Sequence, residues 1–425
     1  MNSNSRKPKI CLALPGINYV PDTTYVLNTI PIVNALKDEF DITLVFRSIL
    51  KADVPPEHSY LTILLSNSTE STSSESVYFS PTNPFKAFSY LNQLEKFAHD
   101  HARQFDLIIE RQWILVGSLA SAFSRRGVPA ISIHEAEFYT AKRVSLRSWK
   151  HWRTELNTTI MATILPHLRQ RWINQTHSLI VETEQMKQFL LKHQRIKPDV
   201  NIYAIPNGVD PTIFYPRDRP ACRQQLGIAP DAFVLVYVGS LNRFIQEPAP
   251  LIQALGQIHH PNIVLHILGD GMKRRELKRF ARHYSSPTIF HGKVSQDQAA
   301  LYIGAANLCV APYNKSLFPE HQFTSASLKV CEYLACGRLV MTIPCDRMNH
   351  LLDHGCYGFL VENQTESYIQ LLQHLPDLGT LTEMETTLIQ NLNTGKLANQ
   401  HIVLSWDHIS EFYKQAIRET FSRFK

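Results

Sequence analysis

Short apolar runs alternate along this chain with longer segments in which apolar residues recur every three or four positions. A continuous apolar run is typical of a strand buried on both faces of a parallel sheet. The runs that predict strands lie at 9–14, 40–46, 106–110, 129–133, 178–181, 233–238, 263–268, 288–291, 308–311, 339–343 and 358–361. The helical segments lie at 23–36, 85–104, 117–126, from 184 onward, and at 250–258, 273–283, 301–306 and 327–337. This alternation predicts an α/β protein with doubly wound parallel sheets.

One turn signal divides the pattern into two series. Pro206-Asn207-Gly208 is strong turn punctuation between two runs of strand–helix units. We therefore predict a Rossmann-like N-terminal domain at 1–204 and a second Rossmann-like domain at 205–404, facing each other across a cleft. The tail at 405–425 places its apolar residues on one face, which predicts an amphipathic helix packed on another part of the protein.

The composition adds limits to this picture. The chain has 425 residues, of which 44% are hydrophobic and 19% are charged, as expected for two or three globular domains. The net charge of +6 suits an anionic ligand and does not by itself indicate nucleic acid. No apolar run approaches the ~18 residues of a membrane span and the start of the chain is polar, so a cytoplasmic protein is expected. The seven cysteines include no C-x-x-C pair, which favours reduced thiols and no metal site.

A hydroxyl-rich loop followed by a helix at 324–337 has the features of an anion site. Thr324, Ser325 and Ser327 are N-cap residue types, and Gly337 provides a stop. Free backbone N–H groups at a helix start favour phosphate, and Lys329 adds a point charge. Glu332 comes one turn later and can accept hydrogen bonds from a diol. From this segment alone, a capped helix with a surface Lys–Glu pair is the favoured interpretation.

Glycines and polar residues recur where the predicted strands end. Ligands of open α/β sheets bind at the carboxyl ends of the strands. The residues at these positions are Gly16, His134, Glu135, Gly239, Gly269, Asp270, Gly271 and the helix start at 327–332. Neither G-x-G-x-x-G after a strand nor G-x-x-x-x-G-K-[ST] occurs, which argues against a dinucleotide oxidoreductase and a P-loop nucleotidase.

Four sequence blocks in this order resemble the retaining glycosyltransferases of family 4 (group 1), which have the GT-B architecture. They are IPNGVD at 205–210, VYVGSL at 236–241, LGDG at 268–271 and SLKVCEYLACGR at 327–338. The resemblance implies two Rossmann-like domains and a last helix that crosses back to the first of them. It also implies a metal-independent transferase of glycan biosynthesis, with no cofactor besides a nucleotide-sugar co-substrate, UDP- or GDP-linked.

The same resemblance assigns roles to individual residues. Glu332 would hold the ribose hydroxyls of the donor. The diphosphate would lie against the loop and helix start, formed by Thr324, Ser325, Ala326, Ser327 and Leu328. The turns at Gly16, at Gly239 and Ser240, and at Gly269, Asp270 and Gly271 would approach the donor. His134 and Glu135 of the first domain would face the transferred sugar or the acceptor.

The sequence departs from the family pattern at several of these positions. Thr324 stands where the family often has a first glutamate, and Ser240 stands where an arginine is usual. Ile245-Gln246 replaces the usual Lys-Gly, and Gly16 is a single glycine where two are common. The grip on the diphosphate would therefore fall on Arg243, Lys329 and backbone amides.

The basic segment 142–174 contains three tryptophans and has two interpretations. It can form a peripheral contact with the inner face of an anionic membrane, or it can be a long helix with a solvated basic face and tryptophan in the core. Residues 51–85 are polar and serine-rich, which predicts a long excursion between domain elements.

We expect an enzyme that moves a hexosyl group from a nucleotide sugar to a sugar, lipid-linked or small-molecule acceptor, with retention of configuration. Two alternatives remain open at this point. One is a non-catalytic scaffold or regulatory partner with the same fold, because the basic residues after Gly239 are displaced. The other is another GT-B enzyme, such as a nucleotide-sugar epimerase or a phosphorylase.

Overall fold

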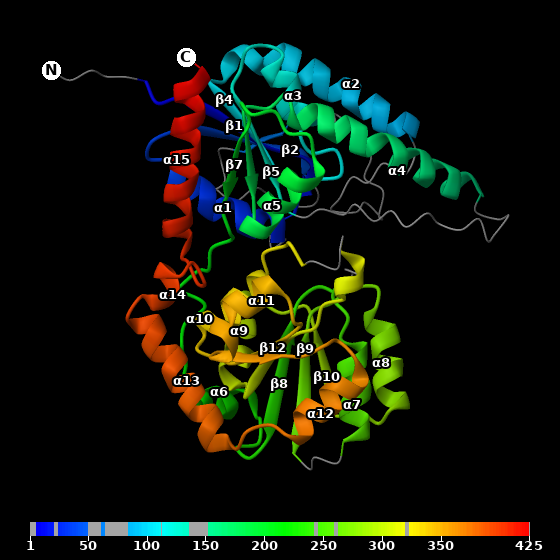
Figure 1. The fold of residues 1–425 in the computed structure, drawn as a ribbon, viewed down its shortest axis with the longest axis vertical. Helices are drawn as coiled ribbons and strands as arrows, with labels where there is room; N and C mark the ends of the chain where they lie inside the picture. The colour runs from blue at the N-terminus through cyan, green and yellow to red at the C-terminus, as the bar shows by residue number, and fades with distance from the viewer. Residues whose placement is uncertain are drawn as a thin grey trace. The chain divides into compact units, whose positions relative to one another are not determined.

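The structure, a computed structural model, describes residues 6–20, 24–49, 61–63, 84–111, 113–135, 152–241, 245–258, 262–318 and 323–424 (Figure 1). The chain forms two compact units. The first unit consists of 1–207, 324–326 and 406–425, and the second consists of 208–323 and 327–405. The expected boundary at 204/205 falls three residues before the end of the first segment of this unit, at Asn207.

A parallel sheet forms the centre of the first unit. Among the described residues it has seven strands in the order β3-β2-β1-β4-β5-β6-β7. The strands are β1 (Lys9–Tyr19), β2 (Asp41–Ile49), β3 (Leu61–Ile63), β4 (Leu107–Glu110), β5 (Ala130–His134), β6 (Ser178–Val181) and β7 (Asn201–Ala204). The order reverses between β1 and β4, which is the point where doubly wound sheets bind ligands.

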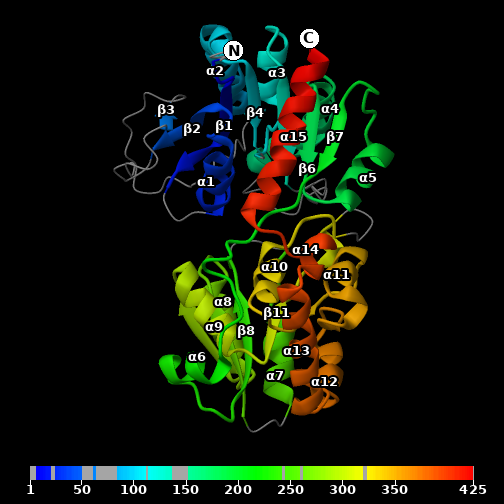
Figure 2. The same ribbon diagram turned by 90° about the vertical axis from the view of Figure 1, so that its left-hand side faces the viewer.

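Helices cover both faces of this sheet. On one face, α2 (Pro84–His101), α3 (Ser118–Ser124) and α4 (Trp152–Ile173) enclose an apolar core that includes Phe97, Phe123 and Trp172. On the other face, Thr420 of α15 (Trp406–Phe424) hydrogen-bonds Ser178 of β6, with 2.7 Å between the hydroxyl oxygens. Figure 2 shows α1 (Thr24–Leu36) beside α15, and the two helices pack together.

The strand β1 is longer than the sequence predicts. Pro15 and Gly16 were expected to close a strand at residue 14, but pairing with β2 resumes at Asn18 opposite Ser48. The register shift between Leu14 and Asn18 accommodates the proline, which has no N–H to donate. Gly16 therefore lies within an irregular stretch of strand and not in a turn after it.

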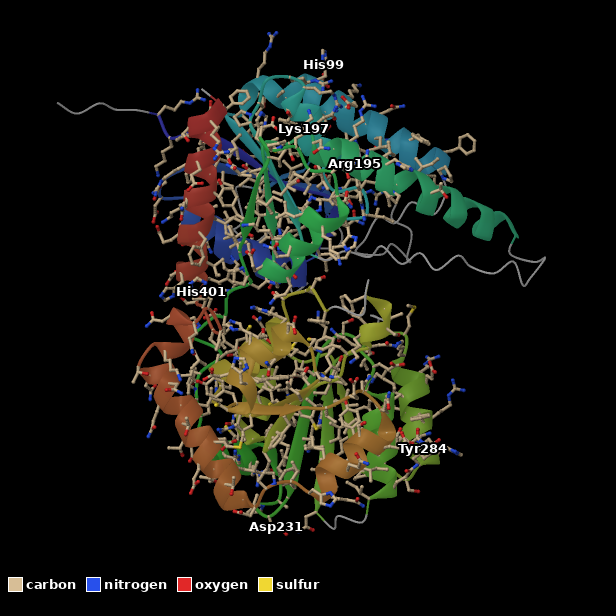
Figure 3. All side chains as sticks on the ribbon, in the orientation of Figure 1. His99, Arg195, Lys197, Asp231, Tyr284 and His401 are labelled. Carbon is tan, nitrogen blue, oxygen red and sulfur yellow. The ribbon has the colours of Figure 1, made fainter. Side chains whose placement is uncertain are left out.

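Within the first unit, the loop after α5 (Glu184–His193) is hydrogen-bonded to the end of α4. The carbonyl of Arg195 accepts hydrogen bonds from Gln170 Nε2 and Asn174 Nδ2, each at 2.8 Å. The N–H of Lys197 donates to Asn174 Oδ1 at 2.9 Å. Figure 3 labels Arg195 and Lys197 in this loop.

The second unit repeats the same architecture. Its described residues form a parallel sheet of six strands in the order β10-β9-β8-β11-β12-β13. The strands are β8 (Phe233–Val238), β9 (Ile263–Leu268), β10 (Thr288–Gly292), β11 (Leu308–Ala311), β12 (Val340–Thr342) and β13 (Gly358–Leu360). The expectation of α/β units with doubly wound parallel sheets is confirmed.

The second sheet also has a core on each face. One core includes residues from α9 (Gln296–Ala305), α10 (Leu328–Ala335) and α11 (Asp346–Leu351). The opposite core includes residues from α7 (Ala249–Gln257), α8 (Arg274–His283) and α12 (Thr365–Gln373). The remaining helices are α6 (Arg219–Leu226), α13 (Leu378–Asn393) and α14 (Lys396–Asn399).

Within the parts of the chain that the structure describes, no helix combines the length and the hydropathy required to cross a bilayer. The proposed membrane segment 142–174 is only partly covered, because 142–151 lie outside the described residues. Trp172 is buried in the core of the first unit, and Arg169 is buried and donates to the carbonyl of Ile114. These two side chains are therefore not part of an exposed surface. The serine-rich stretch of the 51–85 excursion also lies outside the described residues.

Candidate functional site

Two glycine turns meet at the carboxyl edge of the second unit's sheet. Gly239 follows β8 with φ 154°, and Gly269 follows β9 with φ 152°. The N–H of Gly239 donates to the carbonyl of Leu268 at 2.9 Å. A Cβ at Gly269 would lie 1.8 Å from the Gly239 carbonyl oxygen, so the two turns pack backbone against backbone. Only glycine fits at Gly269, both for space and for its left-handed conformation.

The helix α10 begins beside these turns, as its capping residues predict. Ser327 is the N-cap, and its Oγ accepts a hydrogen bond from the N–H of Val330. The same Oγ lies 2.6 Å from the hydroxyl of Tyr313, which fixes the capping side chain. Gly337, with φ 67°, follows the last turn in the left-handed conformation expected of it. The helix predicted at 327–337 is confirmed.

Lys329 reaches from α10 to the turn after β8. Its side chain is 92% buried, with its Nζ 4.2 Å from the centre of the Tyr237 ring and 5.5 Å from that of Tyr313. A Cβ at Gly239 would lie only 2.6 Å from this Nζ. Lys329 and Gly239 are distant in the sequence but lie together in the structure, and we call the site that they form the cationic corner. The aromatic faces of Tyr237 and Tyr313 stabilise the charge there.

Glu332 lies one turn further along α10. It is partly buried, and this burial raises the pKa of its carboxyl to about 7, against the lowering effect of Lys329. A carboxylate in this setting has few waters to satisfy it, so it is suited to hydrogen bonds from ligand hydroxyls.

Gln246 is the second residue of the Ile245-Gln246 pair, which was expected to replace a Lys-Gly pair. Its Oε1 accepts a hydrogen bond from the hydroxyl of Tyr237 and would lie 2.9 Å from a Cβ at Gly239. A neutral amide therefore faces the turn, and the Ser240 carbonyl accepts a second contact from Tyr237 at 3.3 Å. Arg243, the other predicted cation, lies outside the described residues.

The Gly269-Asp270-Gly271 turn is held by Asp270. Its Oδ1 accepts the N–H of Gly271 at 2.8 Å, and its Oδ2 lies 3.4 Å from Arg274 Nη1. The carbonyl of Asp270 accepts the N–H of Leu241 at 2.9 Å. This carboxylate thus shapes the backbone beside the cationic corner.

In the first unit, the candidate residues lie at the ends of β1 and β5. His134 is buried, and its Nε2 lies 3.2 Å from Ser132 Oγ. Gly16 is covered by Trp113, whose ring would lie 2.3 Å from a Cβ at that position. The indole of Trp113 donates to the buried carboxylate of Glu110 at 2.7 Å. Gly16 is therefore enclosed by protein rather than open to a ligand in this conformation.

Glu135 forms an ion pair with a buried arginine. Arg111, directly after β4, donates from Nε to Glu135 Oε1 at 2.9 Å and from Nη1 to Thr29 Oγ1 at 2.6 Å. The side chain of Arg111 is 3% exposed and that of Glu135 is 19% exposed. Breaking a buried pair leaves the remaining charge desolvated.

Replacing Glu135 by leucine is therefore expected to lower the free energy of unfolding by about 3 kcal/mol, because Arg111 would remain buried without its carboxylate. Urea unfolding of the whole protein measures the change. The matched control is Glu39→Leu, which breaks a more exposed pair with Arg418 and should cost under about 1 kcal/mol. Equal costs for both variants would show that the Arg111–Glu135 pair is not a buried structural element.

Sequence reasoning missed Glu182, which follows β6. Its carboxylate accepts hydrogen bonds from Asn207, Ser325 and Ala326. Burial and the nearby Glu135 raise its pKa to about 7. Its position in the sequence could have identified it, because a polar residue directly after a buried strand lies at the edge of a parallel sheet where ligands bind. Thr324, Ser325 and Ala326, predicted to contact the donor, are thus bonded to the first unit.

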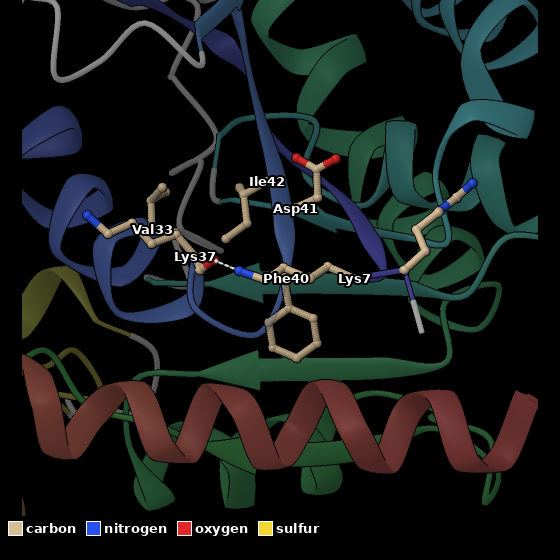
Figure 4. A pocket seen from close by; sticks show the side chains of 7 residues that line it. Lys7, Val33, Lys37, Phe40, Asp41 and Ile42 are labelled. Atoms are coloured by element: carbon tan, nitrogen blue, oxygen red, sulfur yellow. Dashed lines mark hydrogen bonds between the residues drawn. The ribbon is translucent and has the colours of Figure 1, made fainter. Parts of the chain in front are cut away.

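One cavity among the described residues lies away from this candidate site. An open hollow of about 380 Å³ is lined by residues at the amino end of β2 and by Lys7 and Lys37. Figure 4 shows it with the hydrogen bond from Lys7 Nζ to the Lys37 carbonyl, 3.1 Å long. Because ligands of such sheets bind at the carboxyl ends, the geometry of the turns and not the volume of this hollow identifies the candidate site.

The fold is the one found in GT-B glycosyltransferases. Residues 63–213 match the profile of Glycosyltransferase Family 4, and residues 232–377 match that of Glycosyl transferases group 1. Both halves of the chain therefore resemble glycosyltransferases of this type, as its four sequence blocks predict.

Curated relatives match part of the chain. N-acetyl-alpha-D-glucosaminyl L-malate synthase of Bacillus anthracis is 22% identical over 55% of this chain and 58% of its own length. D-inositol 3-phosphate glycosyltransferase 1 of Catenulispora acidiphila is 32% identical over 50% of this chain and 52% of its own length. The chain spans about half the length of the curated relatives it matches.

Solved structures match over nearly the whole chain. Sucrose-phosphate synthase from Thermosynechococcus elongatus superposes with a TM-score of 0.71 at 18% identity, covering 98% of this chain and 100% of its own. The Anabaena protein HepE, in complex with UDP-glucose, superposes with a TM-score of 0.66 at 15% identity, covering 97% and 100%. At these identities the superpositions establish the GT-B fold.

Proposed function

We propose that the protein transfers a hexosyl group from a nucleotide sugar to an acceptor hydroxyl, with retention of configuration and without a metal ion. The observation that carries the proposal is the cationic corner of the second unit. There Lys329 of α10 lies against the glycine turn after β8, with Glu332 one turn further along the same helix. A cation, a helix N-terminus and a carboxylate in this order fit a diphosphate followed by a ribose.

The chemistry of the donor assigns a role to each group. The diphosphate would lie against Gly239 and the first turn of α10, where backbone N–H groups donate and Lys329 supplies charge. The ribose hydroxyls would donate to Glu332. Departure of the sugar leaves negative charge on the diphosphate, and preorganised N–H groups and a fixed cation stabilise that charge. Metal independence is proposed on this ground, since the protein itself supplies the positive charge.

The acceptor side is assigned to the first unit. His134 and Glu135 follow each other at the end of β5, at the edge of the sheet where ligands bind. The relatives named above act, by their names, on L-malate and on D-inositol 3-phosphate, and both of these are anionic hydroxyl compounds. We include both compounds as acceptors to be tried, together with sugars and lipid-linked acceptors.

A thermal-shift screen against UDP-, GDP-, ADP- and dTDP-sugars tests the proposal. A ligand that binds only the native state at 100 times its Kd adds about 2.7 kcal/mol. For a domain of this size, this should raise Tm by roughly 5–10 °C. We expect a UDP- or GDP-sugar to give that shift, because HepE was solved with UDP-glucose. The lack of a shift with every compound would contradict the assignment.

A non-catalytic partner with this fold is the second candidate. It is favoured by Ser240 and Ile245-Gln246, which replace the arginine and the Lys-Gly pair usual after Gly239. Incubation with the best donor and an acceptor panel, followed by analysis of the products, separates the candidates. A new glycoside supports the transferase, an isomerised nucleotide sugar indicates an epimerase, and binding without turnover supports the partner role.

A further inference from the structure

Two consecutive side chains after β6 bind the three residues that precede the N-cap of α10. The hydroxyl of Thr183 donates to the carbonyl of Thr324 at 2.5 Å. Glu182 Oε2 accepts hydrogen bonds from Ser325 Oγ at 3.0 Å and from the N–H of Ala326 at 2.8 Å. These three residues cluster with the first unit, although the chain on both sides of them belongs to the second.

The other oxygen of Glu182 binds Asn207, a residue far from 324–326 in the sequence. Its Oε1 accepts a hydrogen bond from Asn207 Nδ2 at 2.8 Å, and Asn207 is the last residue before the chain enters the second unit. Asn207 and the 324–326 segment lie more than 100 residues apart in the sequence. One carboxylate therefore binds two segments of the first unit that are far apart in the sequence, Asn207 and 324–326.

The surroundings of Glu182 make these bonds sensitive to its charge. The side chain is buried, and charge-assisted bonds to a buried carboxylate are stronger than neutral ones. Arg111 at the end of β4, Glu135 at the end of β5 and Tyr413 of α15 interact with it electrostatically. Burial and Glu135 raise its pKa to about 7, and the bonds from Ala326, Asn207 and Ser325 lower it.

The segment held by Glu182 leads directly into the candidate donor site. Ser327, the residue after Ala326, caps α10, and the first turn of that helix carries Lys329. The backbone of the segment sets where the N–H groups of this turn point. Glutamine cannot replace the carboxylate, because it has one acceptor oxygen and would turn its NH₂ group toward a group that already donates.

We propose that Glu182 is a positioning residue for the donor, fixing Thr324–Ala326 so that the start of α10 is ordered before the diphosphate arrives. This inference rests on the proposed function, since it takes the nucleotide sugar as the ligand of α10. Glu182 itself acts through the segment and not on the reacting atoms.

Hydrogen exchange tests the structural half of the proposal without any ligand. In full-length Glu182→Gln, the amides of 324–330 should exchange at least about 10-fold faster than in the wild type, while the strands of both sheets keep their protection. The matched control is Glu184→Gln, two residues along, where the side chain is 57% exposed and bonds within α5. Unchanged exchange in Glu182→Gln would overturn the proposal.

Calorimetry with UDP-glucose tests the functional half. Glu182→Gln should raise the Kd roughly 10-fold while kcat at saturating donor stays within about 2-fold, because ordering of the segment is a cost of binding. The ratio of the two Kd values should be larger at pH 8.5 than at pH 6, since the wild-type carboxyl holds its proton at pH 6. Equal Kd values, or a loss confined to kcat, would overturn the proposal.

A second variant keeps the proposal testable if Glu182→Gln does not fold. Ser325→Ala removes one of the three bonds and should give changes of the same sign, roughly 3-fold in exchange and in Kd. If the wild type binds no UDP-glucose, the donor assignment fails separately, and the exchange result still decides whether Glu182 orders the segment.

Discussion

The Glu332→Gln protein is expected to bind its nucleotide sugar roughly 100-fold more weakly than the wild type while it keeps its fold. The ribose diol would lose a charged acceptor, and hydrogen bonds to charged groups contribute about 1.5–3 kcal/mol. Glutamine keeps the volume of the side chain, so packing in α10 should change little. Isothermal titration with the donor found by the thermal-shift screen measures the loss.

The pH dependence sharpens this prediction. The pKa of Glu332 is raised to about 7, so the carboxylate is lost as the pH falls through that value. Donor affinity of the wild type should therefore fall between about pH 8 and pH 6, whereas that of Glu332→Gln should fall less, because only the contribution of Glu182 remains. The control is Glu362→Gln in the same unit, which breaks a surface pair with Lys315 and should bind donor normally. Equal affinity for Glu332→Gln and the wild type would refute the ribose assignment.

The Gly269→Ala protein is expected to be severely destabilised, by about 3–5 kcal/mol. A methyl group would lie 1.8 Å from the Gly239 carbonyl oxygen, and two backbone segments would have to separate to make room. The left-handed φ of 152° adds strain for any residue with a Cβ. Urea unfolding, followed by a probe in the second unit, measures the cost, and donor binding should be lost with it.

A second glycine separates the effect of space from the effect of backbone conformation. Gly395 also has a positive φ, 74°, but a Cβ there would meet nothing within 4 Å. Gly395→Ala should therefore cost only about 1 kcal/mol. If the two variants cost the same, the contact between the turns after β8 and β9 is not what requires glycine at Gly269.

The local pattern of the chain predicts much of the fold. The boundaries of β6, β8 and β9 match the apolar runs, and α15 begins at Trp406 and ends at Phe424, as its apolar face predicts. β1 was missed in part, because its pairing with β2 resumes beyond a proline that usually ends a strand. The helix α13 was not predicted, since few of its side chains are buried and most of its surface is polar.

The residues of the candidate site were also predicted only in part from the sequence. Lys329, Glu332 and Gly239 stand in sequence blocks that resemble a known family, so they were predicted. Tyr237 stands in one of these blocks but was given no role, and Glu182 stands in none of them, because what defines both is contact with residues far along the chain. The hydrogen bond from Ala326 to Glu182 spans 144 residues, and no local periodicity encodes it.

The discontinuous first unit has a consequence for synthesis of the protein on the ribosome. The face of its sheet around Ser178 is covered by α15. About 200 residues are made between Asn207 and that helix, which takes roughly 10–40 s at 5–20 residues per second. During this time the second unit can fold while the first still exposes an apolar face. The nascent chain therefore presents a surface for chaperones until α15 emerges, and truncation before Trp406 leaves that surface open permanently.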